Sequence, residues 1–435
     1  VHANKYGQAT LFIRKNGQVT PRLTRFKHWA ILKENLDLPS VDITELAGDL
    51  TYRFLAEANT IRDLENITYN YSETGAESLY DLSRDGYIFY EHRPEKQLLT
   101  AYGYTFFKGM NWSDVHSFCF DLETTDLSPG KGVIFAIAMG DNRGFEQVIH
   151  INEMPELELI QTLVETIARL DPDVIVNHNI FEFDLPFLKH RALVNDDIQL
   201  NIGRIGLDWG ARDENPLLER TNKEGTRFGT LKVGESTERF RNFDILGRTI
   251  IDTLHLVKKD DVAKREMPRY GLKESAIHYG LASETRQYLQ GSEIYSTYLK
   301  SPGIVLKYAL DDVHEVLAIS DMLSPTYLEL AKIMPLPFQD VITSGTASMI
   351  DRLLVREYLR KRHSIPAPEP KTKTPQGALS ELKRTGVFHD IFNFDASSLY
   401  PSLMIYHKIK PKTDVLNVFV MTLQHLKDLR IDAKE

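Results

Sequence analysis

Cysteine and long apolar runs are nearly absent from this chain. The only cysteine among the 435 residues is Cys119, which excludes an internal disulfide and favours a reducing, cytoplasmic compartment. No run of about 18 apolar residues occurs, and the N-terminus does not have the pattern of a signal peptide. We therefore expect no membrane partner, and we expect Cys119 to pack inside as a small apolar side chain.

An excess of basic residues is also absent. Lys and Arg together number 52, whereas Asp and Glu number 61, which gives a net charge of −9. Bulk charge therefore does not favour a polyanionic partner. Binding to such a partner must depend on local basic patches and on metal ions that offset the acids. The candidate patches, for which solvated helix faces are the alternative, are residues 22–27, 258–269 and 352–362, followed by Lys371 and Lys373.

Length and composition are those of an ordinary globular protein. The 435 residues are enough for about two or three domains, and hydrophobic residues make up 42% of the chain and charged residues 26%. We predict a β-rich N-terminal domain over residues 1–112, because alternating runs there are accompanied by turn-forming pairs. The runs are 9–13, 87–90 and 98–104, and the pairs are Asn16-Gly17 and Asp85-Gly86.

The following region, residues 113–325, alternates between strand and helix patterns. This alternation predicts an α/β domain with a mixed sheet. A helix over 155–170 begins with a proline, as first helical turns often do, and carries an apolar stripe. The expected strands are 115–123, 133–139, 147–151 and 174–176.

The most informative segment is 117–126, SFCFDLETTD. An apolar run leads into Asp121 and Glu123, which are separated by one residue. On a β-strand, positions i and i+2 point to the same face, so these two carboxylates are expected to project side by side. Their like charges repel, and hard oxygen ligands of this kind suit Mg²⁺ or Mn²⁺. For this motif alone, a surface strand with a solvated acid pair is the alternative.

A second acidic segment, 171–190, reads DPDVIVNHNIFEFDLPFLKH. A short apolar run typical of a buried strand is followed by the polar residues 177–179. Asp184 comes next and is flanked by two apolar residues, where an apolar side chain would cost less to bury. An unpaired buried carboxylate is costly, which favours a metal ion or a cationic partner near Asp184. The alternative is a helix-capping role ahead of Pro186.

A third segment, 305–319, reads VLKYALDDVHEVLAI and has the apolar stripe of an amphipathic helix. Tyr308 and Asp312 are four residues apart and share one face, whereas Asp311 and Glu315 share another. We interpret Asp311 and Glu315 as a solvated surface pair. Tyr308 and Asp312 are the candidate functional residues, because a phenol beside a metal-bound carboxylate can orient a water molecule.

Together these segments resemble the three exonuclease motifs of family B DNA polymerases. The matching stretches are FDLET at 120–124, NHNIFEFD at 177–184 and YALDD at 308–312. Each motif alone is weak, but the ordered acids Asp, Glu, Asp and Asp, with Tyr four residues before the last, are specific. The resemblance implies a DEDD 3′→5′ exonuclease of the tyrosine branch, with a ribonuclease H-like core. GRTIIDTLHL at 247–256 and GLKESAIHYG at 271–280 are similar to the linking segments of this family.

A fourth segment, FNFDASSLYPSLM at 392–404, resembles the first palm motif of the same family. The resemblance implies that Asp395 holds a catalytic metal ion and the incoming triphosphate. It also implies that Tyr400 lies under the sugar and excludes a 2′-hydroxyl. A strand followed by a capped helix start is the alternative, but it does not explain the whole motif. A stand-alone exoribonuclease of the same superfamily would explain only the first three motifs.

The resemblance further implies two-metal hydrolysis of the terminal phosphodiester at a DNA 3′ end. The cofactor would be Mg²⁺ or Mn²⁺, as two ions about 3.5–4 Å apart. Asp121 would bridge the two ions, and Glu123 and Asp312 would complete the coordination of one of them. Asp184 would hold the other ion, and Tyr308 would aim the attacking water.

Substrate contacts are expected at three further positions. Asn179 would contact the DNA backbone, and Phe120 and Phe183 would stack on a splayed base. The expected partners are single-stranded DNA 3′ ends and primer-template DNA, with nucleotides binding only through a completed palm. A C-terminal polymerase portion is a further candidate partner.

The palm is expected to be incomplete, because two-metal nucleotide transfer needs at least one more carboxylate. The family supplies it from an Asp-Thr-Asp hairpin, and neither that hairpin nor the Lys and Asn-Ser-x-Tyr-Gly helix occurs in this sequence. We therefore expect exonuclease but not polymerase activity from this chain alone. Val1 in place of Met favours a trimmed chain, and a subunit of a split polymerase is the alternative. A non-catalytic DNA-binding or scaffold subunit is the second candidate function.

Three further regions complete the expected domain plan. Residues 200–243 are polar and interrupt the exonuclease core. They form either a hairpin similar to the family's strand-separating element or a disordered insertion. Residues 326–376 are expected to form a helical connector that returns toward the N-terminal domain, with helices at 325–333 and 347–362. Residues 377–435 would be the start of the palm.

Overall fold

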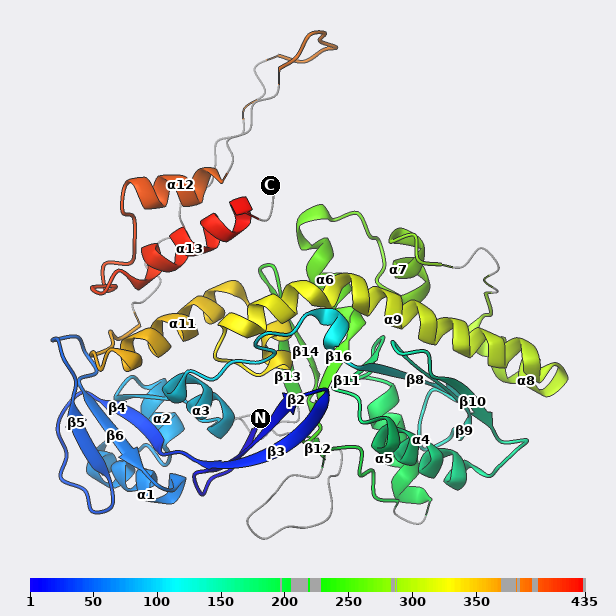
Figure 1. Ribbon diagram of the computed structural model, residues 1–435, viewed down its shortest axis with the longest axis horizontal. Coiled ribbons are helices and arrows are strands. Elements are labelled where there is room, and N and C mark those ends of the chain that lie inside the picture. The colour runs from blue at the N-terminus through cyan, green and yellow to red at the C-terminus, as the bar shows by residue number, and fades with distance from the viewer. Residues whose placement is uncertain are drawn as a thin grey trace.

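Figure 1 shows a β-rich N-terminal region, a central mixed sheet with helices on both faces, and a helical C-terminal part. The fold class expected from the sequence, α/β with a mixed sheet and a β-rich N-terminal region, is confirmed. The computed structural model describes residues 1–435 except 196–197, 205–217, 220–227, 283–285, 287, 369–380, 382–383, 393–397 and 433–435.

The N-terminal region begins with a three-stranded antiparallel sheet in the order β1-β2-β3. Its strands are β1 (His2–Ala3), β2 (Gln8–Lys15) and β3 (Gln18–Arg25). The pair Asn16-Gly17 joins β2 to β3, with φ values of 52° and 80°. Asn and Gly tolerate this left-handed conformation, which matches the twist of the flanking strands. The predicted hairpin is therefore confirmed.

A second sheet, in the order β5-β6-β4-β7, follows with short helices beside it. Residues 98–104, predicted as a strand, lie mainly in helix α3, so this prediction was wrong. Pro94 starts the helix, and Leu98 and Leu99 are both buried, which a half-buried alternating strand does not allow. The elements are β4 (His28–Leu32), β5 (Asp42–Glu45), β6 (Phe54–Ala58), β7 (Ile88–Tyr90), α1 (Ile61–Glu65), η1 (Asn66–Thr74), α2 (Leu79–Arg84) and α3 (Pro94–Tyr102).

The central sheet has the strand order β10-β9-β8-β11-β16. Strand β8 pairs antiparallel with β9 and parallel with β11, and β11 pairs parallel with β16, so the sheet is mixed as predicted. Each strand expected here is found within two residues of its predicted bounds. The strands are β8 (Ser117–Thr124), β9 (Ile134–Asp141), β10 (Glu146–His150), β11 (Val174–Asn177) and β16 (Thr249–Asp252).

The two faces of this sheet carry different helices. Helices α4 (Glu156–Leu170) and α5 (Asp184–Val194) pack on one face, and α9 (Pro302–Ile333) runs along the other (Figure 1). Successive strand residues point to opposite faces. Phe118, Phe120 and Leu122 of β8 therefore join the core under α4 and α5, and Cys119 joins the core under α9. Both cores consist of buried apolar side chains, and such close packing holds the sheet rigidly between the helices.

Helix α9 is one continuous element of 32 residues. It contains both the predicted helix 305–319 and the segment 325–333, which we expected to begin a separate helix. That boundary is wrong, because the helix passes through Pro325. A proline inside a helix removes one backbone hydrogen bond. Buried Ser324, Leu328 and Ala331 continue the packing on both sides of it, which offsets this cost.

The remaining elements surround the sheet or follow it. Of the two alternatives for residues 200–243, the hairpin is present as β13 and β14, with residues 205–217 and 220–227 outside the described part.

Within the described residues, no helix is both long and apolar enough to cross a membrane. The elements are η2 (Trp112–Asp114), β12 (Leu218–Glu219), β13 (Phe228–Val233), β14 (Ser236–Arg241), β15 (Phe243–Asp244), α6 (Thr253–Lys264), α7 (Leu272–His278), η3 (Gly291–Glu293), α8 (Ile294–Lys300), α10 (Phe338–Thr343), α11 (Thr346–Arg360), α12 (Leu399–Tyr406) and α13 (Val418–Asp432).

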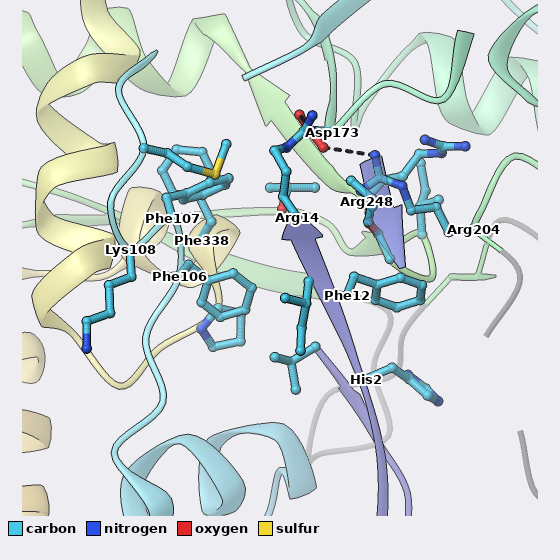
Figure 2. A pocket seen from close by; sticks show the side chains of 18 of the residues that line it. His2, Phe12, Arg14, Phe106, Phe107, Lys108, Asp173, Arg204, Arg248 and Phe338 are labelled. Carbon is cyan, nitrogen blue, oxygen red and sulfur yellow. Dashed lines mark hydrogen bonds and ion pairs between the residues drawn. The ribbon is translucent and has the colours of Figure 1, made fainter. Parts of the chain in front are cut away.

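An ion-pair network ties the β2–β3 hairpin to the central sheet. Arg14 of β2 pairs with the carboxylate of Asp173, which precedes β11. Arg204 also donates to Asp173 at 2.8 Å, and the backbone N–H of His116 donates to it at 2.9 Å. Figure 2 shows Arg14, Asp173 and Arg204 beside a cavity. The cavity has a volume of about 820 Å³ and is lined by the hairpin, residues 105–110 and the start of α10.

Loss of the Asp173 carboxylate is expected to destabilise the protein strongly. The Asp173→Ala change leaves Arg14 and Arg204 without this partner in a nearly buried place, and breaking such a pair costs about 3–5 kcal/mol. Urea unfolding followed by circular dichroism measures the loss. The control is Asp42→Ala, which removes an exposed pair with Lys27 and should cost less than about 1 kcal/mol. Equal effects of the two changes would contradict this role of the network.

Candidate metal centre

Three carboxylates converge near the carboxyl end of β8. Asp121 and Glu123 project from β8 toward α9, as their spacing predicted, and Asp312 projects from α9 toward them. One oxygen of each residue lies within 4.8 Å of the other two. Asp121 is half-buried, and Glu123 and Asp312 are buried. These are the oxygen ligands that Mg²⁺ and Mn²⁺ prefer.

Asp184 lies at the start of α5 and is 2% exposed. The N-cap position of this helix is Phe183, so the helix-capping alternative for Asp184 does not hold. Burial, followed by the charge of Asp121, raises the pKa of Asp184 well above its ordinary value. Oδ1 of Asp184 has no hydrogen-bond partner among the described residues. A buried acceptor without a partner is costly, and a cation would relieve this cost.

All four acids have a raised pKa, with burial as the first cause. For Asp121 the charge of Asp312 is the second cause, and for Glu123 and Asp184 it is the charge of Asp121. For Asp312, burial raises the pKa and two nearby basic side chains oppose the rise. A cluster of buried carboxylates with this mutual repulsion is stabilised by any bound cation.

The two basic side chains, Arg286 and Lys273, were not indicated by the sequence patterns. Arg286 donates from Nη2 to Oδ1 of Asp312 and from Nη1 to the carbonyl of Tyr308, the latter at 3.2 Å. Its guanidinium carbon lies 4.6 Å from the centre of the Tyr308 ring, and the Lys273 ammonium lies 4.8 Å from it. Lys273 could have been suspected, because it lies in the linking segment 271–280. Arg286 belongs to no motif.

The functional face of α9 is larger than predicted. Tyr308 is 6% exposed, and burial, followed by the charge of Asp312, raises its pKa. The prediction of a solvated Asp311 and Glu315 pair was wrong, because Glu315 is 4% exposed and its Oε1 lies 2.9 Å from Nε of Arg286. Tyr308, Asp311, Asp312 and Glu315 are at positions i, i+3, i+4 and i+7, which share one side of a helix. All four residues can therefore lie close to Arg286.

The polar loop after β11 is anchored to its neighbours. Asn179, a predicted substrate contact, has a φ of 67°, and its N–H donates to Oδ1 of Asp252 at 2.8 Å. Asn177 reaches the acids instead, since its Nδ2 donates to Oδ1 of Asp121 at 3.4 Å. The sequence feature that could have indicated this contact was the place of Asn177 at the end of the strand that pairs with β8.

The predicted stacking role of Phe120 is wrong. Phe120 is fully buried in the core under α4 and α5, on the opposite face of β8 from Asp121 and Glu123. Phe120 directly precedes Asp121, and successive strand residues point to opposite faces, so Phe120 must point away from the two acids. Phe183 is half-buried and directly precedes Asp184, and its role as a substrate contact stays a prediction.

The residues of the palm-type motif are not gathered into a described site. Tyr400 lies on α12 and is 66% exposed, and Asp395 lies outside the described residues. Figure 1 shows α12 and α13 apart from the central sheet, above α11.

Comparison with known proteins identifies the central domain. The family model "DNA polymerase family B, exonuclease domain" matches residues 134–274. Residues 134–274 are therefore similar to the exonuclease domain of family B DNA polymerases. DNA polymerase 1 of Pyrococcus abyssi is 25% identical to this chain over 301 residues, which are 65% of the chain and 35% of the relative. The DNA polymerase of Archaeoglobus fulgidus is 26% identical over 309 residues, which are 70% of the chain and 35% of the relative.

The fold is shared with a solved polymerase. The family B DNA polymerase of Pyrobaculum calidifontis matches 99% of this chain and 63% of its own length, with a TM-score of 0.69 and 18% identity. The chain spans about a third of the length of the curated relatives it matches. The family match includes Asp184, and the acids of the first and third motifs flank it on both sides. An exonuclease domain of this family implies the use of divalent metal ions, which agrees with the acidic cluster.

The metal-free protein should lose stability as the pH rises. Burial raises the pKa of Asp121 to about 7, and that of Glu123 and Asp184 well above their ordinary values. The native state therefore holds protons that the unfolded state has released, so stability falls as the pH rises through the native pKa values. In EDTA we expect the Tm to fall between about pH 5 and pH 8.

The Asp121→Asn variant should show a smaller fall, because it removes one of the repelling charges. At pH 8 without metal it should melt about 2 °C above the wild type, which corresponds to roughly 1 kcal/mol. Added Mn²⁺ should raise the Tm of the wild type more than that of the variant. A lower Tm for the metal-free variant at pH 8 would contradict the repulsion described here.

Proposed function

We propose that this chain is a 3′→5′ exodeoxyribonuclease that hydrolyses the 3′-terminal nucleotide of DNA with two divalent metal ions. The observation that carries the proposal is the convergence of Asp121, Glu123 and Asp312 beside Tyr308, in a domain matched to family B exonucleases. The relatives are named DNA polymerases, which supports DNA as the substrate.

The donor set fits a pair of ions such as Mg²⁺ or Mn²⁺. Asp121, Glu123 and Asp312 supply clustered oxygens, and Asp184 supplies a buried oxygen without a partner among the described residues. Two basic side chains oppose four carboxylates, which leaves an excess of negative charge. Asp121, Glu123 and Asp312 would hold one ion, and Asp121 with Asp184 the other. When bound, the ions would polarise the scissile phosphate and lower the pKa of the attacking water.

The other side chains position the reacting groups. Burial and the charge of Asp312 raise the pKa of Tyr308, so the phenol stays protonated and can hydrogen-bond the attacking water. The cationic groups of Arg286 and Lys273 both lie close to its ring. Water attacks the terminal phosphorus, the bond to the 3′-oxygen of the preceding nucleotide breaks, and that oxygen takes up a proton. The product is a nucleoside 5′-monophosphate.

The domain boundaries form part of the proposal. The N-terminal domain would cover residues 1–112, and the exonuclease domain would begin at 113 and end with α9 at Ile333. The connector would then return to the N-terminal domain, which is supported by the backbone bridges Ala47–His363 and Tyr52–Ile365. The start of the palm would follow the connector. In the proposed exonuclease, the β13–β14 hairpin would help separate primer from template.

Replacement of the shared metal ligand should abolish the proposed activity. The Asp121→Ala variant is expected to lose Mg²⁺-dependent digestion of a 5′-labelled single-stranded oligonucleotide, because both ions lose a ligand. The control is Asp395→Ala, which should digest at the wild-type rate because the palm motif takes no part in this reaction. Wild-type digestion by the Asp121 variant would refute the assignment. Binding of DNA by the wild type without digestion would instead favour the non-catalytic subunit.

Primer extension is not expected from this chain alone. The sequence holds one palm-type motif, around Asp395, whereas nucleotide transfer by two metal ions needs at least one further carboxylate. The assay is best done with the Asp121→Ala variant, so that digestion cannot mask extension of a labelled primer. Addition of nucleotides by this variant would contradict the proposal.

A further inference from the structure

Glu315 is a buried carboxylate that the proposed reaction leaves unused. It lies on α9 one turn beyond Asp312 and is 4% exposed. Its Oε1 is 2.9 Å from Nε of Arg286, yet neither carboxylate oxygen has a well-aligned hydrogen bond among the described residues. A carboxylate is costly to bury, and its pairing with Arg286 offsets part of this cost.

Arg286 connects Glu315 to the metal centre. The guanidinium side chain is 1% exposed, and its three nitrogens face three different acceptors. Nε faces Glu315, Nη2 donates to Oδ1 of Asp312, and Nη1 donates to the carbonyl of Tyr308. The guanidinium group is planar and rigid, so the position of one nitrogen fixes the other two.

Charge neutralisation alone does not account for Glu315. Asp312 contacts the guanidinium directly, and a carboxylate oxygen of Asp311 lies 3.6 Å from Nη1. These two acids already exceed the single positive charge of Arg286. Glu315 adds a contact at Nε, which lies on the same edge of the guanidinium as the Nη2 that binds Asp312. A third acid at this place determines where the guanidinium lies rather than whether it is neutralised.

The position of Arg286 matters because Asp121 and Glu123 lie just beyond Asp312. Their carboxylate oxygens are within 4.8 Å of an Asp312 oxygen. Without an anchor at Nε, the attraction of these acids would draw the guanidinium toward the place of a metal ion.

We propose that Glu315 is a positioning residue of the exonuclease site, which holds Arg286 beside Asp312 and keeps the guanidinium from competing with a divalent ion. The inference rests on the proposed function. It extends that function to a residue outside the four acids and the tyrosine. Glu315 acts through Arg286 and touches neither the ions nor DNA.

The first test is Mn²⁺ binding by the Glu315→Gln variant, measured by calorimetry without DNA. Loss of a residue that orients a metal ligand typically weakens metal affinity by about 10–100-fold, and we expect a loss of at least about tenfold. The matched control is Asp311→Asn, which removes the same charge from the same helix and should weaken binding less. Equal losses in the two variants would show a general charge effect and would overturn the proposal.

A second variant tests the route through Arg286. If the released guanidinium competes with the ion, Arg286→Met combined with Glu315→Gln should bind Mn²⁺ as tightly as Arg286→Met alone. Residues that act through one another give such non-additive effects. Independent, additive losses would overturn the proposal. If circular dichroism shows that Glu315→Gln does not fold, Glu315→Asp replaces it. The shorter side chain of Asp should hold Arg286 less well and cause an intermediate loss of Mn²⁺ affinity. Wild-type Mn²⁺ affinity in the Glu315→Asp variant would overturn the proposal.

Digestion of a labelled single-stranded oligonucleotide separates this inference from the proposed function. A wild-type chain that neither binds Mn²⁺ nor digests DNA would refute the proposed function, and this inference with it. A wild-type chain that does both, alongside a folded Glu315→Gln variant with unchanged Mn²⁺ affinity and rate, would overturn the inference alone. We expect the Glu315→Gln rate to recover at high Mn²⁺, because the defect lies in metal affinity.

Discussion

The repulsion between carboxylates gathered in a buried place is the constraint on which this structure depends. Two periodicities create it. The two-residue repeat of β8 brings Asp121 and Glu123 to one face, and the helical repeat of α9 brings Asp312 to meet them. Two rigid apolar cores hold the sheet between its helices and prevent the acids from moving apart. Divalent cations between the acids, as in the proposed reaction, would offset this repulsion.

Much of this architecture could be predicted from local sequence patterns. The strands of the central sheet, the hairpin at Asn16-Gly17 and the shared face of Asp121 and Glu123 all follow from short-range periodicity. Two errors arose where a short-range rule was not followed through. Phe120 directly precedes Asp121 on the strand and must therefore face the core, away from the acids. Pro94 starts a helix over residues that we had assigned to a strand.

The rest of the site could not be predicted, because long-range contacts create it. Arg286 joins no motif, and only the folded chain brings it against Asp312 and Glu315. Glu315 looks like a solvated residue in a helical pattern, since its burial depends on a partner from a distant loop. Asn177 similarly gains its contact with Asp121 from the parallel pairing of β8 and β11.

Cys119 has a practical consequence. Its side chain is fully buried under α9, and burial together with the nearby acids raises the pKa of its thiol well above the ordinary value. Thiolates rather than thiols react with maleimides, so this sulfur should be inert in the native protein. A cysteine introduced on the β13–β14 hairpin would then be the only reactive one in this chain. A fluorescent probe could be attached there to follow strand movement without first replacing a native residue.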